Sequence, residues 1–221
     1  MSKWEKRIGI FVWITLVFSI GFSVFKIIVT PEVLVGDNVH VRVRSDYVLM
    51  LVQCLLGLFV FGLPNFLERE WKFDMPDYMT ISYFVFLYCA IYLGEVHNFY
   101  HVIPYWDNIL HSFSGGMLSA FGFSLVNILN KSDKIHLELS PGFICLFAFC
   151  FAVMIGAIWE IYEFLGDGLL GLNMQKFKLA DGTLLVGHDA LKDTMYDIII
   201  DSVSALVVVI IGYLTMFKKD N

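Results

Sequence analysis

Positive charge is scarce in this sequence. Lys and Arg account for 15 of its 221 residues, against 21 Asp and Glu, and the formal net charge is −6 at pH 7. Proteins that bind nucleic acids draw their affinity from clustered Lys and Arg side chains that neutralise phosphates. The sequence contains no such cluster, so we expect no nucleic-acid partner.

Cysteine is also scarce, and we expect no cleavable leader. The four cysteines all fall inside apolar runs, where they act as small hydrophobic residues and not as a disulfide framework. The first apolar run, residues 8–29, is too long for the core of a signal peptide, and no small-residue cleavage site follows it. We therefore expect this run to be a retained membrane span.

Apolar residues are abundant instead. They make up 58% of the chain, against roughly 45–50% in soluble domains, and the mean hydropathy is +0.72. A bilayer core needs roughly 20 apolar residues in a helix, because lipid offers no partner for unpaired backbone groups. The sequence predicts an all-α, polytopic membrane helical bundle, one integral membrane domain over residues 1–221, with six spans near 8–29, 48–66, 78–95, 107–129, 142–165 and 194–216.

The connections between the spans predict an orientation. With the N-terminus in the cytoplasm, nine Lys and Arg residues flank the spans on that side and five on the other. This positive-inside bias favours a multi-pass protein of the cell membrane with both termini cytoplasmic. The longest connection, 166–192, is polar and rich in glycine, and we expect it to fold over the membrane surface as a lid.

Ionisable residues gather at the ends of three spans that this topology places at the outer face. Residues three or four apart share one face of a helix, so each span carries a one-sided polar stripe. Ionisable groups inside a membrane should face the bundle interior or a water-filled cavity. The stripes are Asp107 with His111, Glu160 with Glu163, and Asp193 with Asp197 and Asp201.

Carboxylates that face one pocket repel one another and must be neutralised by a proton, a basic partner or a cation. Few basic residues are available, although His188 and Lys192 lie close in sequence. We therefore predict a divalent metal, which could be Mg, Mn, Zn or Fe, because the sequence does not choose among them. The predicted metal ligands are Asp107, His111, Glu160, Glu163, Asp193 and Asp197.

Each stripe also has a simpler explanation. Asp107 and Asp193 could serve only as acids in the first turn of a helix, where the helix dipole favours negative charge. His111 could make an ordinary hydrogen bond between helices. Glu160 and Glu163 are harder to explain in this way, because they lie at the C-terminal end of a predicted helix, where the dipole disfavours them.

Three motifs carry a family resemblance. WDNILHSFSGG (106–116), GAIWEIYEF (156–164) and DTMYDIIID (193–201) resemble the YjdF-like family of uncharacterised bacterial inner-membrane proteins. More distantly, they are similar to the VanZ-like family, named for a teicoplanin-resistance protein. The VanZ-like pattern matches Asp107 with His111, then Glu160 with Glu163, then Asp197 with Asp201. The chain departs from it where Asp201 replaces an Asn and Ser204 replaces a Gly, and neither resemblance supplies a reaction.

The leading hypothesis is a metal-dependent hydrolase or transferase that acts at the outer leaflet on a lipid-linked or envelope substrate. Its predicted catalytic residues are Asp107, His111, Glu160, Glu163, Asp193, Asp197 and Asp201. One alternative is a cation or proton transporter or channel, which is weakened because the inner ends of the same spans carry no comparable polar group. Another is a non-catalytic membrane protein that binds a lipid or a protein partner. The sequence does not determine the oligomeric state.

Overall fold

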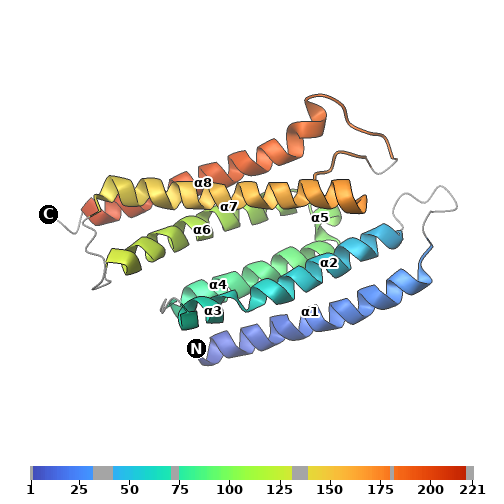
Figure 1. The fold of residues 1–221 in the computed structure, drawn as a ribbon, viewed down its shortest axis with the longest axis horizontal. Helices are drawn as coiled ribbons and strands as arrows, with labels where there is room; N and C mark the ends of the chain where they lie inside the picture. Colours follow the sequence, from blue (N-terminus) through green and yellow to red (C-terminus); the bar gives the residue numbers. More distant parts are fainter. Residues whose placement is uncertain (1, 32–41, 71–74, 131–138, 180–181, 218–221) are drawn as a thin grey trace. The chain divides into compact units, whose positions relative to one another are not determined.

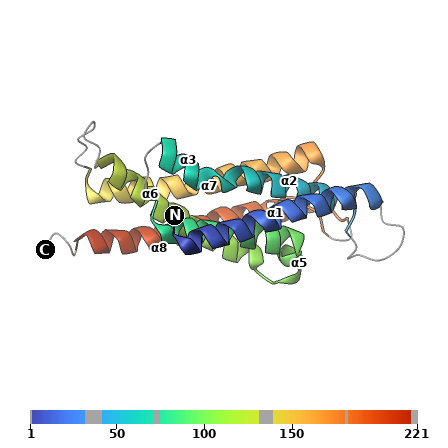
Figure 2. The same cartoon turned by 90° about the horizontal axis from the view of Figure 1, so that it is seen from below.

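The chain folds into helices (Figures 1 and 2). The computed structural model describes residues 2–31, 42–70, 75–130, 139–179 and 182–217. Within these ranges the α-helices are α1 (Lys3–Val29), α2 (Arg44–Phe61), α3 (Leu63–Glu70), α4 (Asp77–Leu87), α5 (Phe99–Val102), α6 (Trp106–Asn130), α7 (Pro141–Leu170) and α8 (Lys192–Phe217). A π-helical segment, η1 (Tyr88–Val96), continues α4, and a short 3₁₀ segment, η2 (Asp189–Leu191), precedes α8.

Six helical segments of the described chain are long and apolar enough to cross a membrane. They are Lys3–Val29, Arg44–Glu70, Asp77–Val96, Trp106–Val126, Pro141–Leu170 and Asp189–Met216. Each overlaps one of the six predicted spans, which confirms the all-α membrane fold. The hydropathy pattern sufficed because each span satisfies its backbone hydrogen bonds internally.

The chain divides into two compact units. The first comprises Met1–Asp107 and Tyr162–Asp193, and the second comprises Asn108–Ile161 and Thr194–Asn221. Helix α7 therefore contributes its N-terminal two-thirds to the second unit and its C-terminal end to the first. Each unit has its own packing.

The first unit is built on α1, α2 and α4 with η1. A capping box starts α1: the Ser2 hydroxyl accepts the Glu5 N–H at 3.2 Å, and the Glu5 carboxylate accepts the Ser2 N–H at 3.0 Å. The core buries large apolar side chains between these helices, among them Leu16, Met50 and Phe84. Burial of such side chains fixes how the helices of this unit pack against one another.

The second unit holds its helices together through small residues. A Cβ atom on Gly122 of α6 would lie 2.9 Å from the Ala148 Cα of α7. The Ser119 hydroxyl of α6 donates to the Ala205 carbonyl of α8 at 3.4 Å. Small residues let membrane helices approach closely where the hydrophobic effect gives no driving force. Ser119 and Gly122 therefore permit close packing of α6 against α8 and α7.

Helix α7 continues about one turn past the predicted end of the fifth span. The sequence suggested an end near residue 165 because Gly166 and Gly168 follow, but α7 continues to Leu170. It stops where Gly171 adopts a left-handed φ of 67° and donates its N–H to the Asp167 carbonyl at 3.1 Å. The helix therefore ends at the glycine whose backbone conformation requires it.

Candidate functional site

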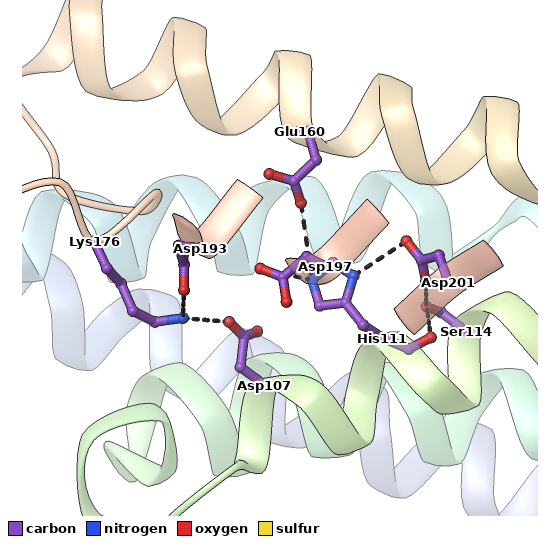
Figure 3. Close-up of polar contacts among 8 residues, drawn as sticks. All are labelled: Asp107, His111, Ser114, Glu160, Lys176, Asp193, Asp197 and Asp201. Atoms are coloured by element: carbon purple, nitrogen blue, oxygen red, sulfur yellow. Dashed lines mark hydrogen bonds and ion pairs between the residues drawn. The ribbon is translucent and has the colours of Figure 1, made fainter. Parts of the chain in front are cut away.

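His111 of α6 lies at the centre of a polar cluster in the second unit (Figure 3). Its Nδ1 lies 3.2 Å from Oδ2 of Asp201 on α8. The other oxygen of Asp201 accepts a hydrogen bond from the Ser114 hydroxyl at 3.2 Å. An ionised carboxylate can only accept, so this contact favours the tautomer that carries its proton on Nδ1. In neutral His111 the lone pair is then on Nε2.

The Nε2 atom of His111 faces two further carboxylates. Oε1 of Glu160 on α7 lies 4.0 Å away, and Oδ2 of Asp197 on α8 lies 3.9 Å away. These separations are too long for hydrogen bonds. Three helices of one unit thus direct an imidazole nitrogen and two carboxylates at a common point, as Figure 3 shows.

The whole cluster is removed from solvent. Relative exposure is 7% for His111, 4% for Glu160, and 2% for each of Asp197 and Asp201. A buried carboxylate without a compensating charge is prohibitively costly. One imidazolium would balance one of the three carboxylates, and a proton or a bound cation on the others would lower the cost of burying them.

Two glycines let Asp201 fit into this cluster. A Cβ atom on Gly156 of α7 would lie 2.5 Å from Oδ2 of Asp201, and one on Gly115 of α6 would lie 2.9 Å from its Cα. Real side chains do not tolerate such approaches. Gly115 and Gly156 therefore allow α8 to bring Asp201 close to both other helices.

A second group of charges lies in the first unit (Figure 3). The Lys176 ammonium donates to Oδ1 of Asp193 at 2.7 Å and to Oδ2 of Asp107. Burial by itself lowers the pKa of Lys176. The carboxylates of Asp107 and Asp193 together raise it by a larger amount, so the net shift is upward. Lys176 therefore stays charged and forms ion pairs with two of the predicted site residues.

The connection after α7 holds Lys176 in place. The Asp167 carboxylate accepts the N–H groups of Met174 and Gln175 at 2.7 and 3.0 Å. Lys176 itself adopts a left-handed φ of 48°, which is uncommon for a residue with a Cβ atom. The backbone is thus turned so that the lysine side chain meets the two carboxylates.

The structure sorts the predicted site residues into these two groups. The second unit brings together His111, Glu160, Asp197 and Asp201, and the first brings together Asp107 and Asp193 around Lys176. Glu163 is buried, with 9% exposure, and belongs to the first unit. The roles of all seven as metal ligands or catalytic groups stay predictions.

Comparison with known proteins identifies the family of this chain. A model described as "Predicted membrane protein (DUF2238)" matches residues 11–218. The chain belongs to this family. A relative from Thermotoga maritima, an "Uncharacterized protein", is 33% identical over 153 residues, which cover 66% of this chain and 69% of the relative. No solved structure matches the chain. Membership of the family confirms a membrane protein, while the YjdF-like and VanZ-like relations stay predictions.

Sequence reasoning missed three members of these groups. They are Ser114, Lys176 and Asp167, of which the last two fall in the connection 166–192 that was predicted to form a lid. The position of Ser114, three residues after His111 on the same helix, is a signal that could have found it. No local signal connects Lys176 to Asp107, because 69 residues separate them.

Proposed function

We propose that this protein binds a divalent cation between Nε2 of His111, Glu160 and Asp197. The observation that carries the proposal is the orientation of the His111 imidazole. Its Nδ1 lies 3.2 Å from the Asp201 carboxylate, and its Nε2 faces the carboxylates of Glu160 and Asp197 at 4.0 and 3.9 Å. Histidines that bind metals commonly donate their second ring N–H to a carboxylate, which fixes the tautomer. Asp201, supported by Ser114, fits that supporting role.

The two separations from Nε2 of His111 also suit a cation. Two ligand atoms that each lie about 2.0–2.6 Å from one ion are separated by at most about 4–5 Å. The separations from Nε2 fall within this limit. A cation would offset the buried negative charge that one imidazole cannot balance. Mixed nitrogen and oxygen ligands are compatible with Zn, Mn or Fe, whereas Mg prefers oxygen.

Such a site would support hydrolysis or group transfer on a lipid-linked or envelope substrate. A bound cation can polarise a phosphoryl or carbonyl oxygen and can lower the pKa of a bound water. Carboxylates of the cluster could then accept a proton in the reaction. The distribution of Lys and Arg, which favours cytoplasmic termini, would place the site near the outer leaflet. The resemblance of the three motifs to the VanZ-like pattern supports the choice of site residues.

Elemental analysis of purified protein, after equilibration with each candidate metal, tests the cation. We expect about one equivalent in the parent, and a loss of at least tenfold in affinity in Glu160→Gln and Asp197→Asn. Asp201→Asn should retain the metal at about 10–100-fold lower affinity, because it acts through His111. Asp189→Asn, the same change at an exposed residue, is the matched control. Equal metal content in the parent, Glu160→Gln and Asp197→Asn would remove the proposal.

A proton or cation path is the second candidate. The observation that favours it is the chain of contacts from Ser114 through Asp201 to His111 inside membrane-spanning helices, since such chains mark proton relays in pumps and transporters. Ion flux into liposomes separates the two. Flux that requires Glu160 and Asp197, with no bound metal, would favour transport. Metal-dependent release of phosphate from a lipid diphosphate, with no flux, would favour the hydrolase.

A further inference from the structure

A groove of about 240 Å³ opens in the first unit, near the start of α1. Its lining comes from three parts of the chain: Lys6, Gly9 and Trp13 of α1, Phe61 and Asn65 of α2 and α3, and Phe84 of α4. Figures 1 and 2 both show the N-terminus of α1 and helix α3 at the same end of this unit. None of these residues belongs to the proposed cation site.

The groove exists because Gly9 has no side chain. A Cβ atom at this position would lie 3.1 Å from Cε2 of Phe84 and 3.6 Å from Cζ of Phe61. The rings of Phe61 and Phe84 are stacked with centroids 4.7 Å apart and form a continuous apolar wall. Any longer side chain at position 9 would therefore fill the space.

The lining surface of the groove is almost entirely apolar, and Lys6 places a charge at one end of it. Lys6 is the one charged residue among those that line it, and it lies in the first turns of α1, where a span leaves the interface. From Lys6 to Trp13 the helix rises about 10 Å into the apolar part of the span. Ile10 and Trp13, beside the groove, are 61% and 48% exposed on a helix that is apolar enough to cross a membrane.

The positive charge of Lys6 favours a ligand with a negatively charged headgroup. A lysine at interfacial depth attracts the phosphate of a lipid headgroup, and its effect is largest on anionic lipids. Phosphatidylcholine carries a compensating ammonium and gains less from this lysine. The groove therefore suits an amphiphile with an acyl chain and a net negative headgroup.

We propose that this groove binds one anionic glycerophospholipid. Its phosphate contacts the Lys6 ammonium, and one acyl chain lies over Gly9 against Phe61 and Phe84. The groove shares no residue with the proposed cation site, and it lies at the end of α1 that is farther from the connection between α1 and α2. The proposal does not depend on the proposed reaction.

Native mass spectrometry of the full chain in a mild detergent, with added phosphatidylglycerol or phosphatidylcholine, tests this site. We expect the parent to retain one phosphatidylglycerol at least threefold more strongly than one phosphatidylcholine. Lys6→Gln should abolish this preference, because it removes the charge from an exposed position and leaves Gly9, Phe61 and Phe84 in place. Gly9→Leu should abolish retention of both lipids.

Two controls match these changes. Lys3→Gln removes a charge one turn earlier, and Gly21→Leu adds the same side chain where a Cβ meets nothing within 4 Å. Both should retain the preference of the parent. Equal retention of the two lipids by the parent, or a preference that survives Lys6→Gln, overturns the proposal. Because Lys6→Gln changes a surface residue, it decides the question even where Gly9→Leu does not fold.

Discussion

Replacement of Gly156 by Ala tests whether close packing at Asp201 holds the histidine in place. The new Cβ would lie 2.5 Å from Oδ2 of Asp201, whereas ordinary contact begins at 3.4 Å. The carboxylate must therefore retreat by about 0.9 Å, or the helices must separate by a similar amount. Either movement stretches the 3.2 Å contact between Asp201 and Nδ1 of His111 beyond hydrogen-bonding distance.

The free-energy cost follows from three terms. Overpacking costs about 1–3 kcal/mol, and a lost hydrogen bond to a charged group costs about 1.5–3 kcal/mol. The better helix propensity of Ala offsets these costs by about 1 kcal/mol. We expect Gly156→Ala to lower the free energy of unfolding by about 2–4 kcal/mol, because these terms are only partly additive. Gly168→Ala on the same helix, where a Cβ meets nothing within 4 Å, should be neutral or slightly stabilising.

Equilibrium unfolding in mixed micelles, followed by circular dichroism, measures both variants. A double-mutant cycle with Asp201→Ala isolates the clash. Truncation of Asp201 removes the atom that the new methyl group meets, so Gly156→Ala should cost less than about 1 kcal/mol in the Asp201→Ala background. The reasoning is refuted if Gly156→Ala is as stable as Gly168→Ala, or if its cost is unchanged when Asp201 is truncated.

Two further predictions concern the partners of the acids. Ser114→Ala should lower the free energy of unfolding by about 1–2 kcal/mol, because it removes a hydrogen bond to Asp201. The control Ser202→Ala removes only a hydrogen bond within its own helix and should cost less. Equal losses of stability in the two variants would contradict the role given to Ser114. Lys176→Gln should cost about 1 kcal/mol at neutral pH and low salt, a modest value because the lysine side chain is 37% exposed and therefore screened. Because its pKa is raised in the folded protein, this contribution is complete below the usual lysine value of about 10.4 and is lost as the pH rises above it. Lys178→Gln is the control, because Lys178 contributes only its backbone hydrogen bonds to the same connection. If the stability of the two variants depended on pH in the same way, the result would argue against the ion pair of Lys176.

The local pattern of the sequence was enough to predict the spans and the polar stripes. Hydropathy identifies a membrane helix because each span must satisfy its own backbone in lipid. Helical periodicity places Asp197 and Asp201 one turn apart on α8, and both of them are buried. Ends of helices were less predictable, since α7 passes two glycines before Gly171 stops it.

Only the tertiary structure decided which groups meet. Asp201 reaches His111 across 90 residues, and Lys176 reaches Asp107 across 69. Such pairings depend on how each helix is rotated and on which small residues, such as Gly115 and Gly156, allow close approach. Composition and periodicity are local quantities and contain neither the rotation nor the approach. The sequence by itself therefore determined a six-span membrane protein with acidic stripes, and packing decided which acids face the imidazole and which face the lysine.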